Sequence, residues 1–443
     1  MNSEPYDLIG VGIGPFNLSL AALADPVPGL RALFLDAKPE FSWHPGMLLP
    51  GTQLQVPFLA DLVTLADPTS RWSFLNYLRE HDRLFPFYFS ERFHAPRREY
   101  DHYCRWVSRE LAGCRFGAEV GAVRRSGDFF EVTYREAERN HTVLARNVVL
   151  GVGTEPVLPA ALAALDSDRV VHSASYLGRR DSIAGLSDVT VVGAGQSGAE
   201  VFLDLLRDAP EHGRRVRWIT QTPFAPMEYS KLGLEHFTPA YTDYFRRLPA
   251  PVRDALVPEQ WQLYKAISAE TIAEIFDVLY EQGIGGEWPE AVLLPGVTVN
   301  AAADTGGQLD LTCRHVEQGR EFGVRTAAVV AATGYAARQP DFLTPISGGV
   351  AWDQQGRYQI DENYRVSFVD DWPAGLYVQN AELHTHGVGA PDLGLGAHRA
   401  AMILNAIAGK AAYRLPARTS FTTFGAPAPQ PDSEAPRVAV PAR

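Results

Sequence analysis

Two glycine-rich turns, each lying between an apolar run and a helix-like segment, constrain this chain more than any other feature. Residues 6–11 lead into GIGPFN at 12–17, and residues 189–192 lead in the same way into GAGQSG at 193–198. Glycines in such turns let the backbone approach closely, and the N-terminus of the next helix offers unpaired N–H groups to a pyrophosphate. One such turn is weak evidence, but two in one chain predict a pair of Rossmann-like dinucleotide-binding domains in an α/β fold.

The first unit has Asn17 where a third glycine is usual, so its turn alone could be only a strand-to-helix connection. The apolar run 31–35 that follows it ends at Asp36, about 20 residues after the loop, where a carboxylate accepts hydrogen bonds from an adenosine ribose. We therefore predict that the first unit holds FAD permanently.

The second unit has all three glycines, but its following run, 216–221, ends without an acid. Arg214, Arg215 and Arg217 lie nearby and favour a 2′-phosphate, although they could equally form a solvated surface. We predict a visiting nicotinamide cofactor in this unit, and NADPH in preference to NADH.

Length, charge and cysteine content limit which kinds of protein this chain can be. A length of 443 residues suits two or three domains, and the net charge of −12 argues against nonspecific nucleic-acid binding. Cys104, Cys114 and Cys313 lack metal-ligand spacing and read as reduced thiols. No signal peptide and no apolar stretch of about 20 residues is present, so we expect no membrane association and a cytoplasmic location.

The apolar runs 147–153 and 328–335 look like two crossings between domains, which predicts that the NADPH-binding domain is inserted within the FAD-binding domain. The stretch between 226 and 288 is too long and too helical for a minimal nucleotide-binding unit, and the last residues are rich in Pro and Ala. The predicted regions are an FAD-binding domain (1–160 and 336–415), an NADPH-binding domain (161–225 and 289–335), a helical substrate-binding segment (226–288) and a disordered tail (416–443).

Further motifs follow in a specific order. They are SWHPGM at 42–47, LQVPFLADLVT at 54–64, PTS at 68–70, FLNYL at 74–78, ATGY at 332–335, and the stretch from Asn380 through His386 to Gly387. Together with GIGP at 12–15 they make the chain similar, up to about residue 410, to the flavin-dependent N-hydroxylating monooxygenases of siderophore biosynthesis.

This resemblance implies a reaction. NADPH reduces FAD, the reduced flavin captures O2 as a C4a-hydroperoxide, and a neutral primary amine attacks the distal oxygen to give a hydroxylamine. The flavin carries the difficult chemistry, so no acid–base residue is expected to be catalytic, and no metal is required. His384 and His386 have metal-ligand spacing, but no acidic or Cys partners recur beside them. Tetramers are common in the family, which implies a homo-oligomer.

The resemblance also implies site residues. Trp43 and His44 are expected near the flavin, although the first could be a core aromatic and the second a structural histidine. The expected FAD-binding residues are Gly12, Gly14, Pro15, Asn17, Asp36, Trp43, His44 and Gln55. The expected NADPH-binding residues are Gly193, Gly195, Gln196, Ser197, Gly198 and Arg217.

The chain departs from the amino-acid hydroxylases of this family at the substrate positions. Those enzymes typically have Lys in a Phe-Leu-Lys-Asp-Leu segment, where it pairs with the α-carboxylate; here the residue is Ala60. Two Asn residues of those relatives align with Leu234 and Leu263, and a Ser aligns with Gly394. Burying an unpaired carboxylate against such a surface costs several kcal/mol. We therefore predict a short aliphatic diamine, putrescine or cadaverine, as the substrate.

The distal ammonium of a diamine needs an acidic or carbonyl partner, and the candidates are Glu235, Glu382 and Asp392. The alternative is that Lys231 or Lys265 has taken over carboxylate binding, in which case the substrate is L-lysine or, less favoured, L-ornithine. A disulfide reductase would need a redox Cys pair, which the sequence lacks. A non-catalytic FAD- and NADPH-binding redox sensor would need an output module, and no segment of the sequence resembles one.

Overall fold

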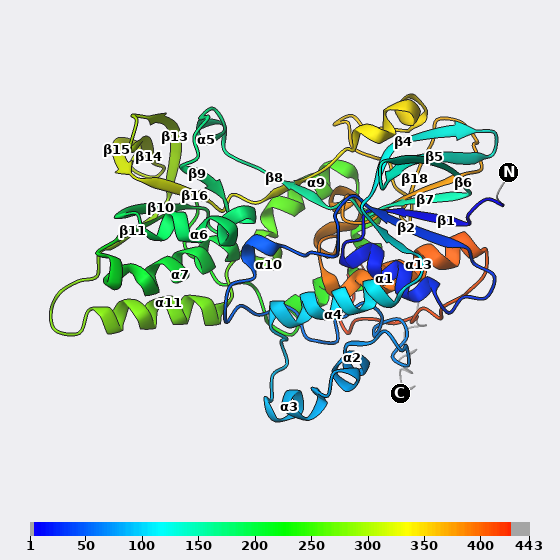
Figure 1. Cartoon of the computed structure of the whole chain (residues 1–443), viewed down its shortest axis with the longest axis horizontal. Helices are drawn as coiled ribbons and strands as arrows, with labels where there is room; N and C mark the ends of the chain where they lie inside the picture. Colours follow the sequence, from blue (N-terminus) through cyan, green and yellow to red (C-terminus); the bar gives the residue numbers. More distant parts are fainter. Residues whose placement is uncertain (1–3, 427–443) are drawn as a thin grey trace, which may run out of the picture.

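The computed structural model describes residues 4–426 and contains two sheet-centred units (Figure 1). The chain crosses between them in the antiparallel pair of β8 (Thr154–Pro156) and β17 (Tyr335–Ala337). Because the chain leaves the first unit through β8 and returns through β17, the second unit is inserted in the first. The structure confirms the predicted α/β class with two Rossmann-like units.

The first unit is built on a six-stranded sheet in the order β18-β19-β7-β1-β2-β3, parallel except for β18. Its central strands are almost continuously apolar and buried, which is typical of a parallel sheet covered on both faces. The strands are β1 (Leu8–Val11), β2 (Ala32–Asp36), β3 (Cys114–Phe116), β7 (Asn147–Leu150), β18 (Arg365–Val366) and β19 (Gly375–Val378).

Helices cover one face of this sheet and an antiparallel sheet covers the other. The helices on that face are α1 (Pro15–Ala24), α4 (Arg97–Glu110) and α13 (Gly396–Ala408). Farther from the sheet, α2 (Phe74–Glu80) packs on α4, and α3 (Leu84–Phe89) packs on α2. The antiparallel sheet comprises β4 (Ala118–Ser126), β5 (Phe129–Glu136) and β6 (Arg139–Ala145), and η4 (Asp341–Gly349) packs beside it. Shorter turns of helix are η1 (Pro45–Met47), α12 (Leu383–His386), η5 (Gly387–Gly389) and η6 (Leu393–Leu395).

The second unit has a five-stranded parallel sheet in the order β12-β11-β10-β16-β9. Its strands are β9 (Val170–His172), β10 (Asp188–Val192), β11 (Arg215–Thr220), β12 (Ala291–Pro295) and β16 (Ala328–Ala331). The helices α6 (Tyr176–Ala184) and α7 (Gln196–His212) cover one face. The other face carries α5 (Ala160–Ala163) and the sheet of β13 (Val297–Asp304), β14 (Leu309–His315) and β15 (Arg320–Thr326), and η2 (Ser173–Ser175) follows β9.

The predicted helical segment 226–288 is helical, but it does not form one body. It contains η3 (Gly233–Phe237), α8 (Pro239–Arg247), α9 (Ala250–Glu259), α10 (Trp261–Tyr264) and α11 (Ala269–Gln282). The first helices pack with α12 and η5 of the first unit around Phe245, whereas α11 packs on α7 of the second unit through Ile275. The prediction of a single substrate-binding segment is therefore corrected, because α11 completes the apolar face of the second unit.

The predicted disordered tail also needs correction where the structure describes it, up to residue 426. The backbone N–H groups of Phe421 and Thr422 each donate to the Glu235 carboxylate at 2.7 Å, and Phe424 packs against Tyr241. Residues 427–443 of that prediction lie outside the described residues. Within residues 4–426, no helix is both long enough and apolar enough to cross a membrane.

Candidate active site

A cavity of about 2490 Å³ lies between the two units and is lined by both of them and by the helical segment. Its volume exceeds the roughly 300–1,000 Å³ of a typical small-ligand pocket, so it has room for more than one ligand. The predicted site residues that line it are Trp43, His44, Gln55, Ala60, Gly193, Gly195, Gln196, Ser197, Leu234, Leu263, Lys265, Asp392 and Gly394. Those that do not line it are Gly12, Gly14, Pro15, Asn17, Asp36, Gly198, Arg217, Glu235 and Glu382.

The first glycine-rich loop has the geometry of a phosphate-binding turn. Gly12 has φ +86°, and a Cβ there would overlap the backbone of Gly151. The N-cap of α1 is Gly14, which has no side-chain cap, and Pro15 begins the helix, so the first N–H groups of the helix remain available. This arrangement fits the pyrophosphate of a dinucleotide.

Asn17 explains why a third glycine is absent from this loop. Its side chain is completely buried, and its amide nitrogen lies within hydrogen-bond distance of the carbonyl oxygens of Gly12 (2.8 Å) and Val149 (3.3 Å). The Gln379 amide donates to its Oδ1 at 2.7 Å. The glycine that makes room is Gly151, at which a Cβ would collide with the Asn17 side chain. Asn17 therefore connects α1 to β1 and β7 by hydrogen bonds, whereas a glycine at this position would only allow the helix and the strands to approach each other.

Replacement of Asn17 by Gly, which restores the usual glycine pattern, is expected to destabilise the protein. The variant removes the partner of the Gln379 amide and the amide donor shared by the carbonyl oxygens of Val11, Gly12 and Val149, which costs about 2 to 4 kcal/mol. The check is the thermal unfolding midpoint of the FAD-loaded protein, with Gly178→Ala, at an open helical position, as the control. An unchanged or higher midpoint would contradict this role of Asn17.

Asp36 lies at the end of β2 beside the first loop, where its position was predicted. Its Oδ2 accepts from the Ile13 N–H at 2.7 Å and its Oδ1 accepts from the Lys38 N–H at 2.8 Å. The carboxylate thus stabilises the conformation of the first loop by these hydrogen bonds, in addition to any contact with a ribose.

The second loop leads into α7, whose N-cap Gly195 likewise has no side-chain cap. Gly193 has φ +140°, and a Cβ there would overlap the carbonyl group of Ala332. Gly198 does not face the cavity, because a Cβ there would meet the Gly193 carbonyl oxygen; it lets the helix pack tightly on the loop. Both loops therefore fit dinucleotide phosphates.

The prediction that Arg217 binds NADPH is not supported by its position. Its guanidinium forms an ion pair with Asp188 and donates to the Arg325 carbonyl oxygen at 3.2 Å. Arg217 pairs with Thr190 in the sheet, upstream of the carboxyl ends of β10 and β11 where the loop lies. Arg215 is likewise paired with Glu290. The sequence places these cations near the loop, but strand register turns them away from it.

Trp43 and His44 stand together at the cavity wall. Their rings are 5.1 Å apart in an edge-to-face arrangement, and the His44 ring is 5.7 Å from that of Tyr335. Burial lowers the pKa of His44 to about 4, with a smaller contribution from the positive charges of Arg97 and Lys38. His44 is therefore a neutral imidazole at physiological pH, and it has an unusual αL backbone with φ +47°.

Gln55 and Gln196, predicted for different cofactors, meet in the cavity wall. The Gln55 amide nitrogen is 3.3 Å from Gln196 Oε1. Sequence reasoning missed two neighbours, Arg97 and Glu200, which form a buried ion pair beside them. Nothing in the local pattern distinguishes these two charges from solvated residues on a helix surface.

Three predicted substrate positions come together at the start of α13. A Cβ built on Gly394 would lie 2.7 Å from Asp392 Oδ1 and 4.0 Å from the Cβ of Ala60. Burial raises the pKa of Asp392 to about 6, although the amides of Gly394 and Leu395 and the charge of Arg399 oppose the shift. This part of the cavity therefore has one carboxylate, ionised at neutral pH, and no cationic side chain at position 60.

The other two acidic candidates are committed elsewhere. Glu235 accepts the backbone N–H groups of Phe421 and Thr422, as described above. Glu382 is fully buried and pairs with Arg399 at 2.8 Å, a residue that is itself only 1% exposed. Neither Glu235 nor Glu382 lines the cavity, whereas Asp392 does, so the structure favours Asp392 among the three acidic candidates.

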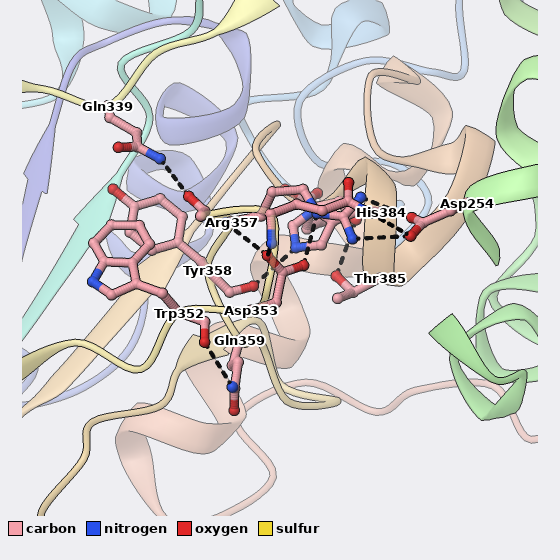
Figure 2. A network of polar contacts seen from close by, with 12 residues as sticks. Asp254, Gln339, Trp352, Asp353, Arg357, Tyr358, Gln359, His384 and Thr385 are labelled. Carbon is pink, nitrogen blue, oxygen red and sulfur yellow. Dashed lines mark hydrogen bonds and ion pairs between the residues drawn. The ribbon is translucent and has the colours of Figure 1, made fainter. Parts of the chain in front are cut away.

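A polar network fixes α9 against the turn that follows η4 (Figure 2). Arg357 Nη1 donates to Asp254 Oδ1 at 2.7 Å and its Nε donates to Asp353 Oδ2 at 2.7 Å. His384 belongs to the same network, because its Nε2 lies 2.8 Å from the Tyr358 carbonyl oxygen. The residues that the structure describes contain no group of three or more metal-ligating side chains, and His384 has this structural contact instead.

Most of this chain is similar to proteins that are already known. The sequence profile described as L-lysine 6-monooxygenase/L-ornithine 5-monooxygenase matches residues 4–337. Putrescine N-hydroxylase of Shewanella oneidensis is 45% identical over 424 residues, which are 95% of this chain and 84% of that protein.

Two solved structures of related enzymes have the same fold. One is DfoA bound to FAD, the desferrioxamine-pathway cadaverine monooxygenase of Erwinia amylovora (TM-score 0.93, 38% identity, 97% of this chain and 100% of that one). The other is the Kutzneria ornithine N-hydroxylase KtzI with reduced FAD, NADP+ and L-ornithine (TM-score 0.85, 30% identity, 92% and 99%). This chain belongs to the L-lysine 6-monooxygenase/L-ornithine 5-monooxygenase family of flavin-dependent N-hydroxylating monooxygenases.

Proposed function

We propose that this enzyme hydroxylates one amine of a short aliphatic diamine, putrescine or cadaverine, with FAD, NADPH and O2, for the biosynthesis of a hydroxamate siderophore. The observation that carries the proposal is the group of Asp392, Gly394 and Ala60. An ionised carboxylate stands there, and the position where amino-acid hydroxylases have Lys is an alanine.

Charge favours a diamine over an amino acid in this group. The distal ammonium of a diamine would pair with Asp392, whereas an α-carboxylate would be repelled by it. Two like charges about 4 Å apart repel by about 4 kcal/mol at an effective dielectric constant of 20. A Ser at position 394 would crowd the Asp392 carboxylate, so Gly394 provides the room in which that carboxylate can accept a ligand.

The bound flavin supplies the oxygen-transfer chemistry, and we assign positioning roles to the protein. The first loop, with Gly12, Gly14 and Pro15, would hold the FAD pyrophosphate, and the second, with Gly193, Gly195 and Ser197, that of NADPH. Trp43, His44 and Gln55 would line the flavin. Since His44 is neutral, its ring would line this part of the cavity without adding a charge beside the flavin.

Apolar side chains would hold the methylene chain. Leu263 is buried in a cluster with Tyr241, Phe245 and Val388, and Leu234 also lines the cavity. A low-polarity wall lowers the pKa of an amine that it buries, which favours the uncharged nucleophile that the reaction requires. The wall thus serves the reacting end of the substrate and Asp392 the distal end.

L-Lysine is the alternative substrate, because Lys231 and Lys265 both line the cavity. The backbone of Lys265 lies against the second loop, with its carbonyl oxygen 3.0 Å from a Cβ built on Gly195, and its ammonium lies 5.2 Å from the centre of the Tyr264 ring. In this alternative one of these lysines would replace the cation that position 60 lacks.

We further propose a cytoplasmic homotetramer, on the basis of the family resemblance. Light scattering coupled to size exclusion measures the assembly directly. A monomeric holoenzyme would overturn this part of the proposal and leave the reaction unaffected.

The test of the substrate is hydroxylamine formation from putrescine, cadaverine, L-ornithine and L-lysine at equal concentrations. We expect kcat/KM for the better diamine to exceed that for L-lysine by at least about 100-fold, which corresponds to about 2.7 kcal/mol. NADPH oxidation is measured in parallel, because only the amine that is hydroxylated couples it to product. Turnover of L-lysine without turnover of either diamine would refute the diamine and leave the flavin chemistry in place.

A further inference from the structure

The chain crosses between the two nucleotide-binding units in the short strands β8 and β17, and the turn η1 and the helices that precede α11 also pack across the junction. Hydride transfer requires a nicotinamide held by one unit to meet a flavin held by the other, and a misplacement of about 1 Å can cost about 100-fold in rate. Side-chain contacts across the cavity must therefore help to fix the relative orientation of the units.

One such contact is an ion pair that joins α4 of the first unit to α7 of the second. Arg97 Nη1 lies 2.7 Å from Glu200 Oε2, and these side chains are only 13% and 5% exposed. Arg97 Nε also donates to the Gln53 carbonyl oxygen at 3.1 Å, so the guanidinium is anchored on its own side. The pair thus joins the two units through side chains that are mostly buried.

Gln196 connects the other carboxylate oxygen of Glu200 to further elements. Its Nε2 donates to Glu200 Oε1 at 2.8 Å and lies 2.9 Å from Thr271 Oγ1. Its Oε1 accepts from the Ser268 N–H at 2.7 Å and faces the Gln55 amide at 3.3 Å. The start of the NADPH loop helix is therefore bound to α11 and to the flavin side of the cavity at the same time.

The cost of breaking this contact is large. Replacement of one residue of the pair would leave the other charge mostly buried and without its partner, which is strongly unfavourable. Burial raises the pKa of Glu200, and the Arg97 charge acts against that shift, so Arg97 helps to keep the carboxylate ionised.

We propose that Arg97 and Glu200 form a latch between the two units that sets the orientation in which NADPH reduces the flavin. Both are positioning residues for flavin reduction. The inference depends on the use of FAD and NADPH by this family and is independent of which amine is hydroxylated.

The test is the limiting rate of anaerobic flavin reduction at saturating NADPH in four proteins: wild type, Arg97→Met, Glu200→Gln and the double variant. A latch predicts that each single variant loses at least tenfold in this rate. It also predicts that the double variant is no slower than the slower single variant, because the same contact is removed in each case. Equal losses that multiply in the double variant would mean that the two residues act separately, and would overturn the latch.

Asp188→Asn is the matched control, since Asp188 and Arg217 form a comparably buried ion pair inside the second unit. We expect the control to keep the wild-type reduction rate within about twofold. If it slows reduction as much as Glu200→Gln, the effect is general destabilisation and the proposal fails.

Arg97→Lys keeps the charge and gives a second route should the neutral variants fail to hold FAD. It is expected to reduce the flavin at an intermediate rate, because a single ammonium cannot reach Glu200 and the Gln53 carbonyl group together. The latch would also be overturned if Arg97→Lys and Glu200→Gln both reduced the flavin at the wild-type rate. Where Glu200→Gln cannot be obtained, a wild-type rate in Arg97→Lys alone would overturn it.

Discussion

Replacement of Asp392 by Asn is expected to raise the KM for putrescine about 30- to 100-fold while the KM for NADPH stays the same. The variant keeps the size of the side chain but loses the charge-assisted hydrogen bond to the distal ammonium, which is worth about 2 to 3 kcal/mol. The measurement is steady-state hydroxylamine formation. Discrimination against L-lysine should also weaken, because the repulsion of its α-carboxylate disappears with the charge.

The pH profile separates this role from a structural one. Since burial raises the pKa of Asp392 to about 6, its carboxyl group is ionised above that pH and protonated below it. The ammonium binds the ionised form, so the KM of the wild type for putrescine should rise as the pH falls through about 6. In Asp392→Asn this rise should vanish.

Glu235→Gln serves as the control, because Glu235 was an equal candidate by sequence and the structure commits it to the backbone of Phe421 and Thr422. Its KM for putrescine should stay within about twofold of the wild type. If Glu235→Gln raises this KM and Asp392→Asn does not, the assignment of the distal ammonium is wrong.

The nucleotide-binding loops were predictable because their signal is local. A glycine required by a positive φ or by a close backbone approach appears in the sequence at a fixed spacing, as at Gly12 and Gly193. The exception was Asn17, which looks like a defect in the pattern. The room that it needs comes from Gly151, and its partners include residues more than 130 positions away, so no local pattern reveals it.

The substrate end of the cavity was predictable only in part. The loss of polarity at Ala60 and Gly394 was visible by comparison with a known motif, but their contact with each other and with Asp392 depends on how the loop before α2 meets the start of α13. Three acids near the site were indistinguishable by sequence. Their hydrogen bonds separate them, because only Asp392 both lines the cavity and is not committed to an ion pair or to the C-terminal segment.

Two other predictions failed for reasons of tertiary structure. Arg217 is close to the NADPH loop in sequence but lies too early in β11 to reach its carboxyl end. Pro- and Ala-rich composition predicted disorder from residue 416, whereas Phe424 provides an aromatic anchor against Tyr241 and Tyr244. Composition averages over a segment and so does not register one or two anchoring side chains.

Replacement of Gly193 by Ala is expected to reduce the rate of flavin reduction by NADPH at least about 100-fold and to leave FAD bound. The backbone there has φ +140°, which residues with a side chain rarely adopt, and the added Cβ would overlap the carbonyl group of Ala332, the residue that follows β16. The loop must therefore move by about 1 Å, away from the position in which its N–H groups meet the pyrophosphate.

The first unit is untouched by this change, so the purified variant should keep the wild-type ratio of flavin absorbance to protein, and dithionite should still bleach the flavin. Gly178→Ala is the control: it adds the same methyl group to α6 of the same unit, in open space, and should reduce at the wild-type rate. A Gly193→Ala variant that is reduced by NADPH within threefold of the wild-type rate would contradict the assignment of this loop to the nicotinamide cofactor. If Gly193→Ala loses FAD and Gly178→Ala does not, the two units depend on each other for cofactor retention. The Arg97–Glu200 ion pair, which joins the units across the cavity, could cause such a dependence.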